Sequence, residues 1–361
     1  MRRRALVQAA LAAPLLLLCT QGRAQVAYPG VIPRTLVFPR DHGSHPAFRT
    51  EWWYITGWVR DAARADAPEL GVQVTFFRHR PGIAEEATSR FAPKELLFAH
   101  AAIADPAHGR LRHDQRVARA GFGLAQAAKQ DTDVAIGDWS LRREGETYAT
   151  RVIARDFAFA LSFTPRSPLL LQGEGGISRK GPRPSQASYY YSRPGLPVRG
   201  TIGIEGRERT VEGIAWLDHE WSSEYLAREA RGWDWTGINF DDGGALMAFV
   251  IRDHDGRVYW AGGTRRDAAG RITLLRPEDV QFTPQRTWRS PRTGATYPVA
   301  LRIAAGAETL DLAPLMDDQE LDSRASVGTV YWEGAVRVLR DGRPVGRGYL
   351  ELTGYAGALR I

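Results

Sequence analysis

The chain has 361 residues, of which 43% are hydrophobic and 10% aromatic, with a single cysteine and a formal net charge of +7. This length suits two domains that each bury a core of their own. Four of the arginines lie within the first 24 residues, so the remainder carries a net charge of +3, and its arginines are scattered. The scattered charge argues against nucleic acid as a partner, because a phosphate backbone is bound by a clustered basic stripe.

The N-terminus predicts an export signal that is cleaved near Ala24. Arginines at positions 2 to 4 precede an apolar run from Ala5 to Leu18, and Gly22-Arg23-Ala24 offers small residues at both positions that a signal peptidase reads. We expect a soluble periplasmic or secreted protein, with Arg3-Arg4 leaving twin-arginine export open beside the plain secretory route. Cleavage would remove Cys19, so we expect no disulfide and no disulfide-linked partner.

Short runs rich in β-branched and aromatic residues recur along the chain and predict antiparallel strands. The clearest runs span residues 51–59, 70–78, 158–163 and 246–252. Asp-Gly pairs supply the positive φ that tight hairpins need. Three such pairs follow in the second half: Asp242-Gly243, Asp255-Gly256 and Asp341-Gly342. Because closure into barrels removes exposed strand edges, we predict an all-β fold of two barrels.

Two segments interrupt this pattern. Residues 121–130 fit a short helix or an irregular crossover, and residues 173–188, rich in glycine and proline, predict a long loop or mobile flap. Prolines follow the strand candidate Tyr189-Tyr190-Tyr191, so we place the domain boundary near residue 197, between domains at 25–197 and 198–361. An echo between residues 52–57 and 233–237, two aromatics before Thr-Gly, suggests duplication.

Residues 213–221 hold the densest group of reactive side chains. On a strand, Leu217, His219 and Trp221 share one face, and Trp216, Asp218 and Glu220 share the other. A histidine among apolar walls can be tuned to exchange protons near neutral pH, and indole faces stabilise a cation. The alternative is a buried histidine bonded to backbone, with the tryptophans filling the core.

A second group precedes the first strand. His42 and His45 lack a defined third ligand, so we predict no metal and expect them to make hydrogen bonds within a loop. Glu51, if buried, requires a partner such as an arginine. The sequence has no Gly-x-Ser-x-Gly elbow, no zincin helix and no phosphate-binding glycine loop, so we expect no cofactor.

Six strings resemble the AttH-type secreted proteins, a family related to carotenoid 1,2-hydratases. The resemblance spans nearly the whole mature chain and implies two packed lipocalin-like, calycin-type barrels that enclose an apolar isoprenoid or lipid. The strings begin at Glu51 (EWWY), Phe98 (FAHAAI), Ser188 (SYYYS), Asp218 (DHEWSS), Gly232 (GWDW) and Gly348 (GYLELTGY).

The hydratase branch implies a cofactor-free hydro-lyase. There an acid protonates a carotenoid double bond, and water captures the carbocation. The hydratases' His-x-Trp pair maps onto His219 and Trp221, whereas their Tyr-x-Asp pair has no counterpart. Asp218 and Asp234 are the nearest acids in sequence and become the candidate proton donors, with His219 as relay. The ligand-binding candidates are aromatic: Trp53, Tyr54, Trp233 and Trp235.

A carrier is the alternative function. A periplasmic lipid carrier or chaperone would serve an export system, through transient association with a membrane or an ABC transporter, and the same residues would only shape its pocket. Removal of the acid should abolish turnover in the enzyme, whereas the carrier should retain its ligand.

Overall fold

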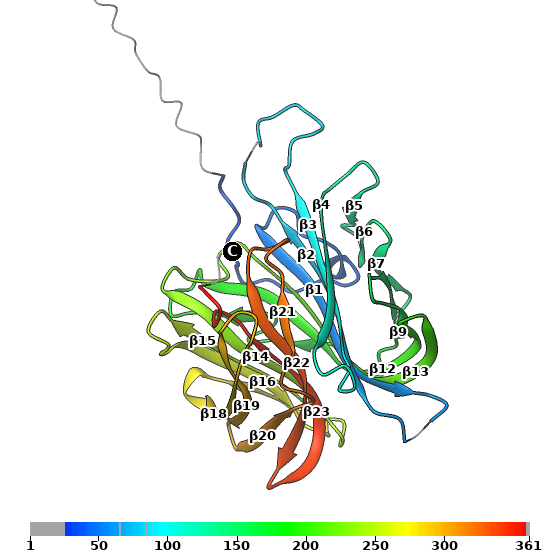
Figure 1. Ribbon diagram of the computed structural model, residues 1–361. Coiled ribbons are helices and arrows are strands. Elements are labelled where there is room, and N and C mark those ends of the chain that lie inside the picture. Colours follow the sequence, from blue (N-terminus) through cyan, green and yellow to red (C-terminus); the bar gives the residue numbers. More distant parts are fainter. Residues whose placement is uncertain (1–25, 65, 84, 359–361) are drawn as a thin grey trace, which may run out of the picture.

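The computed structural model describes residues 26–64, 66–83 and 85–358, and the predicted export signal lies outside this range. The described chain is all-β, with two short 3-10 turns, η1 (Arg40–His42) and η2 (Pro277–Asp279). Its strands form two antiparallel sheets that lie against each other (Figure 1). No helix in this part of the chain has the length and apolar character needed to cross a bilayer. The predicted all-β class is confirmed.

The first sheet curls around a large apolar core. Its edge strands β4 and β5 are consecutive in sequence, and the guanidinium of Arg116 on β4 lies 4.6 Å from the ring centroid of Trp139 on β7, across the closing seam. The strands run in the order β4-β3-β2-β1-β13-β12-β9-β8-β7-β6-β5, with β10 and β11 also paired to β12. Their bounds are β1 (Thr50–Asp61), β2 (Leu70–His79), β3 (Leu96–Ala104), β4 (Leu111–Arg119), β5 (Ala125–Ala127), β6 (Asp133–Ile136), β7 (Trp139–Glu144), β8 (Thr147–Ile153), β9 (Phe157–Phe163), β10 (Leu170–Leu171), β11 (Ile177–Arg179), β12 (Ala187–Ile204) and β13 (Arg207–Ser222).

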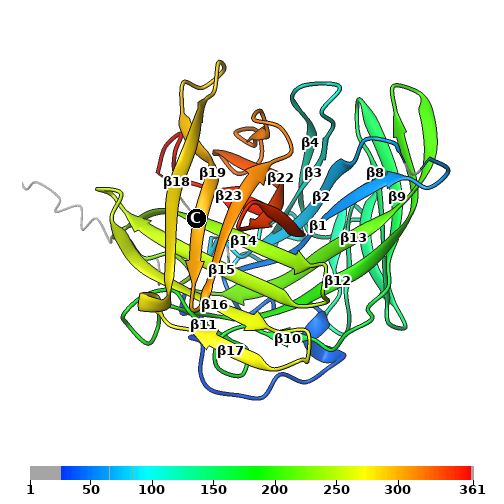
Figure 2. The same cartoon turned by 90° about the horizontal axis from the view of Figure 1, so that it is seen from below.

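The second sheet also surrounds an apolar core, and its two edge strands are likewise consecutive in sequence. Its edges β17 and β18 are joined through η2, and Figure 2 shows the sheet curving away from the first one. The order is β17-β16-β15-β14-β23-β22-β20-β19-β18, with β21 paired to β22. The bounds are β14 (Ala230–Phe240), β15 (Ala245–Asp253), β16 (Val258–Arg266), β17 (Ile272–Leu275), β18 (Val280–Arg289), β19 (Thr296–Ala305), β20 (Glu308–Pro314), β21 (Glu320–Asp322), β22 (Val330–Arg340) and β23 (Arg343–Leu352).

The predicted strands and hairpins are confirmed. The four predicted runs lie in β1, β2, β9 and β15, and the three Asp-Gly pairs connect β14 to β15, β15 to β16 and β22 to β23. In the last of these turns Asp341 has φ 50° and Gly342 has φ 75°. Both central residues of this two-residue hairpin therefore occupy the left-handed region, as a type I′ turn requires.

The two irregular segments adopt more strand structure than expected. Residues 121–130 contain turns and the short strand β5, with no helix. Residues 173–188, predicted as a loop or mobile flap, contain β11, which pairs with β12, and four buried polar side chains: Ser178, Lys180, Gln186 and Ser188. Residues 180–186 form no strand, so the predicted loop is confirmed for this part, and mobility stays a prediction. The glycines and prolines here serve tight turns that return the chain to the sheet.

The strand β12 continues through the prolines near residue 197. A register shift between Arg193 and Leu196 absorbs Pro194-Gly195, after which pairing with β13 resumes. The chain passes from the first sheet to the second between Ser222 and Ala230, later than the predicted boundary near residue 197. Proline is tolerated at such a bulge because the bulge already lacks a regular ladder hydrogen bond.

Aromatic side chains fill the contact between the two sheets. Trp58 and Trp216 from the first sheet pack with Trp235 and Tyr349 from the second in one buried cluster. The indole nitrogen of Trp58 donates to the carbonyl of Gly348 across this contact, at 3.0 Å. The second sheet thus covers the outer face of the first sheet over β1, β12 and β13, and the cavity described next opens beside this cluster.

Candidate active site between the two sheets

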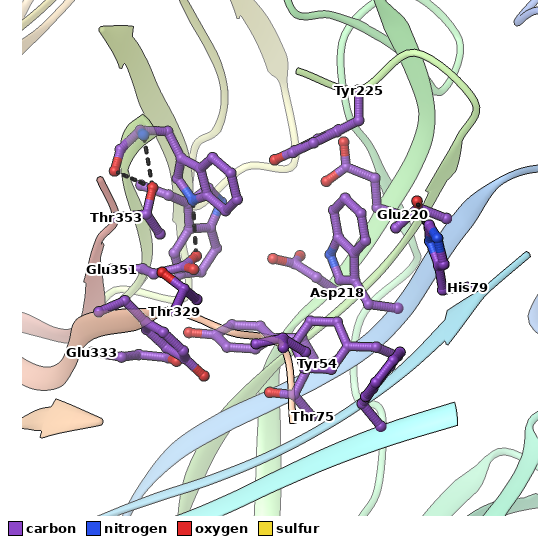
Figure 3. A pocket seen from close by; sticks show the side chains of 18 of the residues that line it. Tyr54, Thr75, His79, Asp218, Glu220, Tyr225, Thr329, Glu333, Glu351 and Thr353 are labelled. Atoms are coloured by element: carbon purple, nitrogen blue, oxygen red, sulfur yellow. Dashed lines mark hydrogen bonds between the residues drawn. The ribbon is translucent and has the colours of Figure 1, made fainter. Parts of the chain in front are cut away.

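A cavity of about 330 Å³ lies between the sheets rather than within either barrel. Figure 3 shows its walls, with Tyr54 and Asp218 from the first sheet and Glu333 and Glu351 from the second. Aromatic side chains are the largest group among the other residues that line it. The aromatic residues are Trp52, Tyr54, Phe77, Phe98, Tyr190, Tyr225, Trp233, Trp235 and Tyr331, and the acids are Asp218, Glu220, Glu333 and Glu351.

The two echoing strings identified in the sequence meet at this cavity. Tyr54 on β1 and Trp235 on β14 pack edge to face, with ring centroids 5.3 Å apart. Trp52 and Trp233 both pack against Tyr225, at 4.7 and 5.4 Å. Three of the four predicted ligand-binding residues, Tyr54, Trp233 and Trp235, therefore line one pocket.

Among the acids that line the cavity, Asp218 accepts the most hydrogen bonds. Its Oδ1 accepts from the Ser192 hydroxyl at 2.5 Å and from the Trp216 indole at 2.7 Å, and its Oδ2 accepts from the Tyr190 hydroxyl at 2.7 Å. Burial raises the pKa of Asp218 to about 7, although these three donors favour the charged form. Desolvation prevails, so Asp218 can hold and release a proton near neutral pH.

Glu220 lies on the same face of β13 and is held by a buried cation. Lys180 Nζ lies 2.8 Å from Glu220 Oε1, and the Ser188 hydroxyl donates to the same oxygen. Burial raises the pKa of Glu220 and outweighs the effect of Lys180. The Lys180 ammonium also faces the rings of Tyr190 and Phe249, at 4.9 and 4.4 Å. This ion pair fixes the rim of the aromatic wall beside Asp218.

The second sheet adds two acids that the sequence reading missed. Glu333 and Glu351 are directly opposite each other on β22 and β23. Burial and the neighbouring carboxyl group of Glu351 raise the pKa of Glu333, and burial raises that of Glu351 to about 7. Glu351 falls within the closing string of the family resemblance. In the sequence, the only signal for Glu333 was its place in the strand β22, where alternate residues share a face.

Asp234 faces away from the cavity. It lies between the pocket-lining Trp233 and Trp235 and therefore points to the other side of β14. Arg252 lies 3.1 Å from its Oδ1, and the Tyr355 hydroxyl donates to it. Burial raises the pKa of Asp234 to about 6 despite Arg252. Of the two candidate proton donors, only Asp218 lines the pocket.

His219, Trp221 and Trp53 lie inside the first barrel, on the opposite face from Asp218. The His219 ring stacks on Trp53 with centroids 4.7 Å apart, and its Nε2 lies 2.9 Å from Glu51 Oε1. The predicted alternation of faces along β13 is thus confirmed. The pocket lies on the Asp218 face, and none of these three residues lines it.

Glu51 organises a buried polar network. Arg78, its direct cross-strand partner, donates from Nε to Glu51 Oε2 at 2.8 Å, and both side chains are 0% exposed. The expected arginine partner is confirmed. His45 lies between Glu51 and Asp41, with contacts of 2.7 and 3.0 Å, which also confirms hydrogen bonding by this loop histidine.

This network contains one group of metal-ligand type. His45, Glu51 and His219 each present a ligand atom within 4.8 Å of the other two. Two imidazoles and a carboxylate are donors that Zn²⁺ accepts. The same three atoms are joined by hydrogen bonds, which a metal would have to replace. The absence of a metal stays a prediction, and His42 instead contacts the Tyr191 hydroxyl at 2.7 Å.

The fold and site define an all-β protein of two lipocalin-like sheets with an aromatic, acid-lined pocket between them. The chain belongs to the AttH-like family, whose model matches residues 29–355, which confirms the resemblance seen in the sequence.

Several solved structures resemble this one. A Nitrosomonas europaea protein that carries the AttH designation is 53% identical, covers 91% of this chain and 100% of its own, and superposes with a TM-score of 0.85. Kievitone hydratase from Nectria haematococca is 15% identical over 92% of this chain and 97% of its own, with a TM-score of 0.68. CghA is 14% identical over 90% of this chain and 95% of its own, with a TM-score of 0.50. These last two show the fold alone. No curated protein matches the sequence.

Proposed function

We propose that this protein adds water to a carbon–carbon double bond of an isoprenoid-like molecule bound between its sheets, with Asp218 as the proton donor. The observation that carries the proposal is a buried carboxyl group, with its pKa raised to about 7, in the wall of an aromatic cavity. Such a group is protonated in a large fraction of molecules near neutral pH and can therefore act as a general acid.

The walls suit the intermediate of this reaction. Protonation of an alkene leaves a carbocation, which the faces of Tyr54 and Trp235 would stabilise. The similar fold of a protein named as a hydratase is consistent with the reaction class, although fold by itself does not assign an activity.

The volume of the cavity limits the size of the ligand that it can enclose. At about 330 Å³ it lies at the lower end of the range of about 300–1,000 Å³ typical of small-molecule sites. It suits a short isoprenoid, or the end of a longer chain whose remainder lies outside. A complete acyclic carotenoid would exceed it, so protonation would take place at one terminus.

The test is incubation of the purified protein with farnesol and, separately, with lycopene in detergent micelles, in ¹⁸O-labelled water. Mass spectrometry should find a product heavier by one labelled water molecule. Asp218→Asn should abolish this product while keeping the native circular dichroism spectrum, and Asp234→Asn should retain it because that side chain faces away from the cavity.

Two results would contradict the hydratase. One is recovery of all the substrate without label after incubation with the wild-type protein. The other is equal turnover by the Asp218→Asn variant. A ligand that co-purifies and is retained without reaction by wild type and Asp218→Asn alike would instead support the lipid carrier.

A further inference from the structure

Glu333 and Glu351 face Asp218 across the cavity. They project from neighbouring positions of β22 and β23 in the second sheet, whereas Asp218 projects from β13 in the first (Figure 3). Two carboxyl groups this close do not readily both ionise, because their charges repel each other at a site removed from water. One proton is therefore readily shared between them.

Polar atoms without partners mark the same part of the cavity. Glu333 is 2% exposed, and its Oε1 has no aligned hydrogen-bond donor among the described residues, while Gln73 donates to the other oxygen. The buried Thr75 hydroxyl also lacks a partner in this part of the chain. Tyr54, the cross-strand partner of Thr75, lies close enough to Glu333 to favour its charged form.

These groups point to a water site. An unsatisfied buried polar group costs about 1–3 kcal/mol, and a polar cavity normally recovers this energy by holding a water molecule bonded to two to four partners. Thr75 and Tyr54 from the first sheet and Glu333 from the second all line the cavity, so a water molecule held there meets polar groups from both sheets.

We propose that Glu333 and Glu351 form a proton-sharing pair that binds the reacting water and accepts its proton. This inference rests on the proposed hydration. Asp218 gives its proton to one alkene carbon, so the π bond and the Asp218 O–H bond break as a C–H bond forms. The water oxygen then bonds to the cationic carbon, and its proton passes to the carboxylate of the pair. The pair then releases this proton to solvent, and Asp218 takes up a proton from solvent. This restores the starting state without any oxidant or reductant.

The experiment separates the two half-reactions. Glu333→Gln and Glu351→Gln should each lower hydration of farnesol at least about 100-fold, the scale of a lost general base. Both variants should still transfer deuterium from heavy water to the alkene carbon, because that step needs only Asp218. Glu320→Gln is the matched control, since Glu320 is a buried carboxyl group of the same sheet that bonds to Ser290 and Thr293 outside the cavity.

Hydration at the wild-type rate in both variants would overturn the proposed role of the Glu333–Glu351 pair. So would a parallel loss of hydration and deuterium transfer in folded protein, because that result would place the pair in ligand binding. A wild type that neither hydrates nor exchanges would instead refute the proposed function.

Infrared spectroscopy tests the shared proton without any ligand. At neutral pH the wild-type spectrum should contain a protonated-carboxyl band that Glu333→Gln or Glu351→Gln alters and Glu320→Gln leaves in place. An identical band in all four proteins would refute proton sharing.

Discussion

Replacement of Asp218 by asparagine should change how the stability of the protein depends on pH. Asparagine imitates the protonated carboxyl group but cannot ionise. The pKa of Asp218 is about 7 in the folded protein, against an ordinary value of 3.8. At about 1.4 kcal/mol per pH unit, this difference corresponds to roughly 4 kcal/mol of folding free energy.

The sign of this pH dependence follows from how tightly the folded and unfolded states bind the proton. Because the folded protein binds this proton more tightly than the unfolded chain, the stabilisation is complete below pH 3.8 and is lost as the pH rises through about 7. The contribution of Asp218 to the stability of the wild-type protein should fall over this window. The Asp218→Asn variant should not show this loss, so its stability relative to wild type should increase between about pH 4 and 7 and then level off.

Urea unfolding followed by tryptophan fluorescence, at intervals from pH 4.5 to 8, measures this difference directly. The control is Asp311→Asn, because Arg302 lowers the pKa of Asp311 and its titration falls below this range. The control's stability relative to wild type should stay constant. A constant stability difference for Asp218→Asn as well would refute the assignment of a raised pKa to this residue.

Three further perturbations follow from the structure. Arg78→Met should lower the free energy of unfolding by about 3–5 kcal/mol in urea titrations, because it leaves the buried carboxylate of Glu51 without its arginine; a loss below about 1 kcal/mol would contradict this. Gly342→Ala should cost about 1–2 kcal/mol in the same assay, from its φ of 75° alone, since no atom lies within 4 Å of the added methyl group; an unchanged stability would argue against the left-handed turn. Trp235→Leu should reduce hydration of farnesol by more than it reduces farnesol affinity, because a ring face stabilises the cation more than the neutral alkene; equal losses would assign Trp235 to binding alone.

The sequence was sufficient for the class of fold and for local geometry. Strand runs, Asp-Gly hairpins and the alternation of His219 with Asp218 all follow from neighbours along the chain, because φ preferences and the two-residue period of a strand are local properties. The need of a buried Glu51 for an arginine also followed from the cost of burying a charge. That this arginine is Arg78 could be known only from the pairing register of β1 and β2.

The tertiary structure decided which face of β13 forms the site. Alternation separates His219 and Trp221 from Asp218 and Glu220, but both faces of this strand are buried, one by the interior of the first barrel and the other by the second sheet. The cavity depends on how the second sheet packs on the first, and it brings Asp218 together with Glu333 and Glu351 from strands more than a hundred residues later in the chain. No local pattern in the sequence encodes how close these three acids lie, because their proximity results from the packing of two separate sheets.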